Sequence, residues 1–107
     1  MLMVPSLHKG RRIRIVSIPR KITFSDNLPE IASHGWLGIE LTTLGTDPLN
    51  PARYMVDTKV AGPALEKHAP ATYEWWGKHS NYWKSHREFE MPFITFDVED
   101  CELLPEE

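Results

Sequence analysis

The sequence contains a single cysteine, Cys101, so no disulfide bond can form within the chain. A lone thiol is typical of proteins in a reducing compartment. No stretch approaches the ~20 consecutive apolar residues that a membrane-spanning helix needs. Residues 1–7 also lack the charged region that opens a secretory signal peptide. We therefore expect a soluble, cytoplasmic protein.

The motifs that usually reveal an enzyme are also missing. Gly35 and Gly38 are separated by the start of an apolar strand and form no phosphate-binding loop. His79 and His86 are seven residues apart, whereas metal-binding histidine pairs on a helix are usually three or four apart. Cys101 lies among acidic residues, which raise the pKa of a thiol and reduce its reactivity. The sequence thus predicts no catalytic residue, metal site or cofactor.

The 107 residues fit one domain with one hydrophobic core, spanning residues 1–107. Apolar residues alternate with polar ones in several short runs, which is typical of half-buried strands. Proline, glycine, aspartate and asparagine separate these runs and predict turns. We expect strands over 12–18, 36–41, 54–60, 92–98 and 102–104, and a short helix over 25–32. Residues 64–90 break the strand pattern and are expected to be helical.

The order of these elements resembles the SH3-like barrel. The resemblance rests on Gly10-Arg11-Arg12-Ile13-Arg14-Ile15, on the strand that Gly35-Trp36-Leu37-Gly38-Ile39 opens after a long loop, and on the closing run Val98 to Leu104. It covers residues 9–60 and 92–104. It implies a mainly β fold, a small five-stranded barrel with a helical insertion over about 64–90. The peptide-binding residues of signalling SH3 domains are absent, so the resemblance implies no recognition of proline-rich peptides.

Charge is distributed unevenly along the chain. Before Asp26 every charged residue is basic, and after Arg87 every charged residue is acidic. One interpretation follows from the resemblance, which implies that the first and last strands pair antiparallel, so that Arg12 and Arg14 lie near Glu99 and Glu102. A second interpretation is a nucleic-acid surface formed by five residues: Lys9, Arg11, Arg12, Arg20 and Lys21.

Residues 73–86 contain three of the four tryptophans in fourteen residues. On a helix, Tyr73, Trp76 and Trp83 share one stripe, while a second stripe carries Trp75, His79, Tyr82 and His86. One interpretation is that both stripes pack inside the protein. The other is that one stripe stays exposed, and exposed aromatic clusters tend to mark contact sites.

The sequence therefore predicts a non-enzymatic protein interaction module that associates with itself or with a protein partner through an aromatic surface. That surface would comprise Trp36, Tyr73, Trp75, Trp76, His79, Tyr82, Trp83 and His86. The alternatives are a small nucleic-acid-binding barrel that uses the basic N-terminal strand, and a small-ligand or enzymatic pocket formed by the aromatic and histidine residues.

Overall fold

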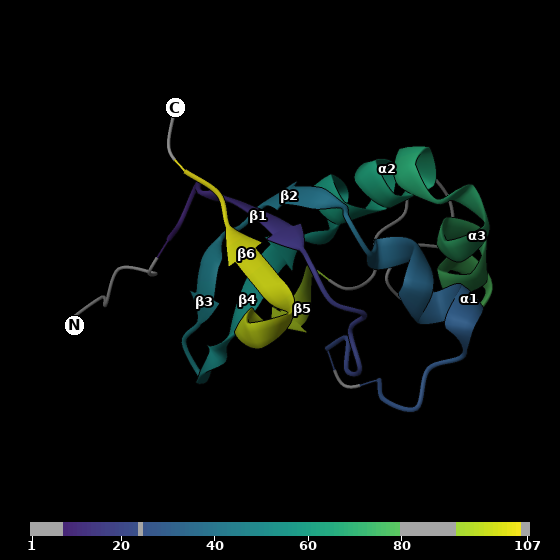
Figure 1. Cartoon of the computed structure of the whole chain (residues 1–107), viewed down its shortest axis with the longest axis horizontal. Coiled ribbons are helices and arrows are strands. Elements are labelled where there is room, and N and C mark those ends of the chain that lie inside the picture. Colours follow the sequence, from purple (N-terminus) through teal and green to yellow (C-terminus); the bar gives the residue numbers. More distant parts are fainter. Residues whose placement is uncertain (1–7, 24, 80–91, 106–107) are drawn as a thin grey trace.

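A computed structural model describes residues 8–23, 25–79 and 92–105 of the chain. Within these residues the strands gather at one side of the molecule and the helices at the other (Figure 1). The elements, in chain order, are β1 (Arg12–Ile15), α1 (Glu30–Ser33), the 3-10 turn η1 (His34–Trp36), β2 (Glu40–Thr42), β3 (Gly45–Asp47), β4 (Asn50–Asp57), α2 (Thr58–His68), α3 (Pro70–His79), β5 (Phe93–Asp97), the 3-10 turn η2 (Val98–Asp100) and β6 (Cys101–Leu103).

The strands form two three-stranded antiparallel sheets, ordered β2-β1-β6 and β3-β4-β5. In the first sheet, Ile13 of β1 lies between Leu41 of β2 and Leu103 of β6. The predicted pairing of the first and last strands is confirmed, and it brings Arg14 opposite Glu102. The 3-10 turn η2 carries the chain from the second sheet to the first.

The expected five-stranded SH3-like barrel is wrong. The described residues form six strands in two separate sheets, with three α-helices and no closed barrel, so the fold is mixed α/β. The physical reason lies partly at Thr43, whose hydroxyl accepts the Gly45 N–H at 2.9 Å and donates to the Met55 carbonyl at 2.8 Å. Gly45 adopts a φ of 107°, which only glycine adopts readily. The chain therefore leaves one sheet after β2 and enters the other at β3.

Helix α2 begins where a strand through Val60 was expected. Asp57 caps the helix, because its carboxylate accepts the Lys59 N–H at 2.9 Å. Thr58, Ala61, Gly62 and Leu65 are buried. This spacing of three, four and seven residues is that of one helix face, and it overrides the alternation of Thr58 and Val60.

Helix α1 is shorter than expected and begins at Glu30 instead of following an Asp26 cap. Asn27 adopts a left-handed φ of 51°, which interrupts the helical backbone before Pro29. Trp36 belongs to η1 and not to a strand. Helix α3 continues through Gly77 to His79, and residues 80–90 of the expected helical insertion lie outside the described residues.

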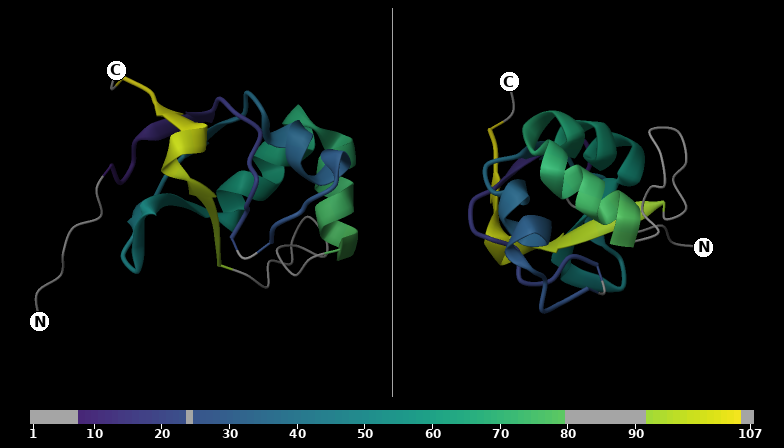
Figure 2. Two further views of the ribbon diagram at one scale, coloured as in Figure 1. Left: turned by 60° about the horizontal axis from the view of Figure 1, so that its bottom comes forward. Right: turned by 90° about the vertical axis from the view of Figure 1, so that its right-hand side faces the viewer.

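The core lies between the sheets and the helices, and Figure 2 shows the helices gathered over one end of the strands. Trp36 packs edge-on against Phe96 of β5, with ring centroids 5.0 Å apart. Trp76 of α3 donates a hydrogen bond from Nε1 to the Ala32 carbonyl at 2.8 Å, which fixes α3 to α1. No described helix is long and apolar enough to cross a membrane.

Candidate functional site

The predicted aromatic surface divides between the core and the exterior. Trp36 and Trp76 are fully buried and Tyr73 is nearly so, hence these three side chains stabilise the fold and are not available at the surface. Burial also raises the pKa of the Tyr73 hydroxyl. Trp75 is half-buried and stacks on the exposed ring of His79, with centroids 4.6 Å apart.

The second predicted stripe is therefore described only at Trp75 and His79. Tyr82, Trp83 and His86 lie outside the described residues. Nδ1 of His79 lies 2.9 Å from the Trp75 carbonyl, four residues earlier on the same helix. Among the described residues, the accessible part of the predicted surface is therefore one half-buried tryptophan with one stacked imidazole.

Arg12, one of the predicted nucleic-acid residues, lies on β1 with Arg14, and both arginines pair with acids of the neighbouring strands. Glu40 forms ion pairs with Arg12 and with Arg14, whose Nη2 lies 3.2 Å from the carboxylate. Arg14 also lies 3.5 Å from Glu102. The hydrogen bond from Arg14 lowers the pKa of Glu40. The charges of these two arginines are therefore balanced within the sheet.

The remaining predicted cations do not form one surface with β1. Arg11 donates from Nη2 to the Leu104 carbonyl at 2.6 Å. Arg20 lines a pocket of about 570 Å³ together with acidic residues, including Asp97 and Glu99. Lys21 is exposed and lies beside β5, in the second sheet, and Lys9 is exposed ahead of β1. The structure thus distributes the basic residues over several places.

A different feature stands out on the outer face of the β3-β4-β5 sheet. Along β4, Tyr54 and Val56 point to the core, whereas Arg53 and Met55 point to the opposite face. Met55 faces Thr95 across the strands, and Phe93 faces Asp57, so both neighbours on β5 share this outer face. Gly45 of β3 stands opposite Met55 and adds no side chain there.

These side chains form a groove of about 690 Å³. Strands β4 and β5 form its floor. One side is formed by residues 21–23, which lie beside β5, and the other side is formed by the turn between β3 and β4. The lining residues are Lys21, Thr23, Asp47, Pro48, Leu49, Asn50, Arg53, Met55, Pro92, Phe93 and Thr95. The exposed apolar side chains among them make the groove mainly apolar.

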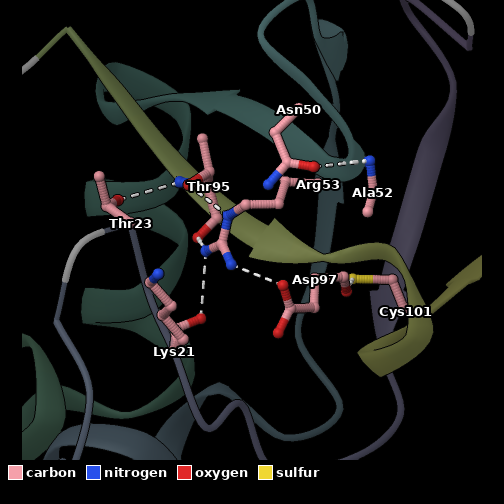
Figure 3. A network of polar contacts seen from close by, with 8 residues as sticks. All are labelled: Lys21, Thr23, Asn50, Ala52, Arg53, Thr95, Asp97 and Cys101. Carbon is pink, nitrogen blue, oxygen red and sulfur yellow. Dashed lines mark hydrogen bonds and ion pairs between the residues drawn. The ribbon is translucent and has the colours of Figure 1, made fainter.

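Arg53 anchors the floor of the groove (Figure 3). The residue is only 6% exposed. Nη1 donates to Asp97 at 2.6 Å, Nε donates to the Thr95 hydroxyl at 3.0 Å, and Nη2 donates to the carbonyls of Thr95 and Lys21 at 2.8 and 3.2 Å. The guanidinium thus joins β4, β5 and the segment at Lys21. Because its donors are used inside the protein, Arg53 serves the site as a rigid support.

The segment on the far side of β5 is fixed by further bonds. Ile22 forms a bridge with Phe96, and the Thr95 N–H donates to the Thr23 hydroxyl at 3.1 Å. The Thr23 N–H in turn donates to the Thr95 carbonyl at 2.9 Å. The backbone of this segment is therefore fixed on one side of the groove, and Lys21 is exposed there.

The turn between β3 and β4 forms the opposite side of the groove. The Asp47 carboxylate accepts the Leu49 N–H at 2.9 Å, and the Asn50 side-chain oxygen accepts the Ala52 N–H at 3.2 Å. Such side-chain bonds to the backbone two residues on stabilise tight turns. The turn presents Leu49, which is 95% exposed. A large apolar side chain is thus held in solvent by an ordered turn.

Sequence reasoning placed Met55, Phe93 and Leu49 in strands and turns and assigned them no function. Two signals pointed to them. Leu49 is an apolar residue in a turn otherwise formed by Asp47, Pro48 and Asn50. Met55 lies on the strand face opposite Tyr54 and Val56. That face also carries Arg53 and Asp57, so the strand pattern by itself did not reveal an apolar groove.

Two features of the described residues bear on metal binding and on nucleophilic chemistry. No group of three or more His, Cys, Asp or Glu side chains in residues 8–23, 25–79 and 92–105 could hold a metal ion. Burial raises the pKa of the Cys101 thiol to about 12, and the nearby carboxylates of Asp100 and Asp97 act in the same direction. A thiol in that state is a poor nucleophile.

The chain was also compared with known proteins. No protein-family model matches it, and neither a curated protein nor a solved structure matches it at a significant level.

Proposed function

We propose that the chain is a non-enzymatic protein interaction module that binds protein through the apolar groove on the outer face of the β3-β4-β5 sheet. The observation that carries the proposal is the exposure of large apolar side chains on both sides of this groove. Leu49 is 95% exposed and Phe93 is 43% exposed. Exposed apolar patches on small soluble proteins tend to mark contact surfaces.

The support beneath the groove favours binding. The floor is a sheet whose strands are joined by the Arg53 bonds, and the side formed by the turn is held by Asp47 and Asn50. A surface that is already ordered loses little conformational freedom when a partner binds. The groove runs beside strands, and its contacts are apolar with a few polar groups at the margins, which is the usual composition of a protein interface.

The basic strand gives weaker support for nucleic acid. A nucleic-acid surface needs cations free to contact phosphates, yet Arg12 and Arg14 are paired with Glu40 and Glu102. The groove itself contains one exposed lysine, Lys21, and an aspartate, Asp47, on its opposite side. We therefore favour a protein partner over a nucleic acid.

A selection of random linear peptides displayed on phage tests the proposal. The wild-type protein is immobilised at low surface density for the selection. The Kd of each enriched peptide is then measured by fluorescence polarisation for the wild type, Phe93→Lys and Met55→Lys. Both replaced side chains are at least partly exposed, so the fold should tolerate the changes. We expect enriched peptides whose Kd rises at least about tenfold in both variants, because a cation is placed in the apolar contact.

Trp75→Ala serves as the matched control, because Trp75 is an aromatic residue outside the groove. Peptides that bind the wild type and this variant equally support the groove. Peptides that lose binding only in Trp75→Ala would assign the function to the helix α3 surface instead. Enrichment insensitive to all three changes, or no enrichment by a wild type that is monomeric, would refute the groove as a protein-binding site.

A further inference from the structure

The groove has the features of a surface that binds a copy of itself, and this inference rests on the proposed function. Leu49 projects from the turn on the β3 side, while Met55 and Phe93 form an apolar depression next to it. A projecting apolar group and an apolar hollow thus lie side by side on one face. In a two-fold dimer both subunits use the same patch, so the patch must be complementary to itself. It must contain both the projecting group and the hollow that receives it.

The groove also carries one positive and one negative side chain, on opposite sides. Lys21 lies on the side of the groove next to β5, and Asp47 lies on the opposite side, at the turn after β3. A two-fold axis that runs along the groove exchanges its two sides. The β3 side of one subunit then faces the β5 side of the other, and Asp47 approaches Lys21 of the partner subunit. Opposite charges would meet twice, once on each side of the axis.

We infer that the occupant of the groove is a second copy of this chain, in a two-fold symmetric dimer. Leu49 of each subunit covers the Met55 and Phe93 surface of the other, and Asp47 pairs with Lys21 of the partner subunit. The apolar contact supplies most of the affinity, because it removes a 95% exposed leucine and a 43% exposed phenylalanine from water. The two charge pairs select the two-fold arrangement over other orientations.

Sedimentation velocity from about 1 to 300 µM, with native mass spectrometry, tests the inference. We expect a monomer–dimer equilibrium for the wild type. In Leu49→Asp, the dissociation constant of the dimer should rise at least about tenfold. The leucine side chain makes almost no contact within its own chain, and the backbone N–H that Asp47 accepts remains, so the variant should fold normally. Ile31→Asp is the matched control, since Ile31 is an exposed apolar residue of α1 outside the groove.

Charge exchange tests the two-fold arrangement itself. Lys21→Asp and Asp47→Lys should each weaken the dimer, and the double variant should recover it, because the pairs are re-formed with reversed sign. Asp47→Lys alone also removes the bond to the Leu49 N–H. Recovery in the double variant cannot come from the turn, so it isolates the charge pair.

The outcomes separate this inference from the proposed function. A wild-type monomer at every concentration, together with groove-dependent peptide binding, would overturn the dimer and leave the interaction module standing. A dimer unaffected by Leu49→Asp would place self-association elsewhere and overturn the inference. A monomer that also selects no groove-dependent peptide would refute both. Two results together support both: Leu49→Asp abolishes the dimer, and the Lys21→Asp, Asp47→Lys double variant restores the dimer that each single charge reversal weakens.

Discussion

Arg53 of β4 and Asp97 of β5 stand opposite each other across the strands, and their side chains meet at 2.6 Å. The arginine is almost completely buried, while Asp97 is partly exposed. This pair lies at one end of the groove, and the next cross-strand pair on the same face of the sheet is Met55 and Thr95. A largely buried ion pair thus supports an apolar surface.

Replacing Arg53 by alanine should destabilise the protein. Removal of one partner from a buried pair costs about 3–5 kcal/mol, because the remaining charge is left without compensation. Asp97 retains access to solvent, so we expect a smaller loss, about 2–3 kcal/mol, in urea unfolding followed by circular dichroism.

Arg53→Lys is the control for charge. A lysine keeps the cation but cannot form the several directed bonds of a guanidinium, so it should recover only part of the loss. An Arg53→Ala variant as stable as the wild type would show that the buried network contributes nothing to folding.

Gly35 should be intolerant of any side chain. A Cβ at this position would lie 2.0 Å from Oγ1 and 2.6 Å from Cβ of Thr72, and 2.9 Å from Cβ of Ala69. Contacts this short force η1 and α3 apart, and overpacking of a core typically costs about 1–3 kcal/mol. We expect Gly35→Ala to lower the free energy of unfolding by at least that amount in a denaturant titration.

Thr72→Ala in the same chain provides the check. It removes the hydroxyl but leaves the Cβ, so it should relieve the clash only in part. Full recovery would mean that the hydroxyl alone sets the close approach. No destabilisation by Gly35→Ala would show that the helix and the turn are not in tight contact.

The sequence predicts the local elements of this fold better than their assembly. Alternation identified the strand around Ile13 and Ile15 and the closing strand around Phe93 to Asp97. The pairing of β1 with β6 was implied by the resemblance to a barrel, and it accounts for part of the uneven charge distribution. The closed barrel did not follow, because the course of the chain is decided at Thr43 and Gly45 by hydroxyl bonds and a positive φ that no periodicity reveals.

The candidate site was harder to predict for a related reason. Trp36 and Trp76 attract attention in a sequence because tryptophans are rare, yet large aromatic side chains are equally suited to a core. The structure buries both. Met55 and Phe93 look like ordinary strand residues, and only the relative placement of β4, β5 and the turn at Leu49 brings them into one groove.

Glu40 should make stability depend on pH below its ordinary pKa. The bond from Arg14 lowers the pKa of the carboxyl below 4.5 in the folded chain. The folded state therefore holds this proton less tightly than the unfolded state does. The resulting stabilisation is present above about pH 4.5 and is lost as the pH falls through the lower, folded-state pKa.

Thermal unfolding of the wild type and Glu40→Gln across pH 2–8 measures this effect. We expect the wild type to be more stable at neutral pH and the two curves to converge in acid, with a smaller difference at high salt, because the pair is exposed. Glu99→Gln is the matched control, because Glu99 is an exposed acid outside the β1–β2 pairs. A constant difference at every pH would contradict a role for ionised Glu40.

Cys101 should be protected from thiol reagents in the folded protein. Its pKa is raised to about 12 from an ordinary value of 9.0, and its Sγ lies 3.5 Å from the Asp97 carbonyl, to which the thiol donates. At pH 8 the thiolate fraction is then about a thousandfold below that of an unperturbed thiol, because each pKa unit is a factor of ten. Reaction with an aromatic disulfide reagent should be correspondingly slow, and fast in denaturant. The neutral thiol is the form that the fold favours, so the linked stability is present below pH 9 and is lost as the pH rises towards 12. Rapid labelling of the native protein at pH 8 would mean that Cys101 is accessible and ionised, and would reopen the case for chemistry at this position.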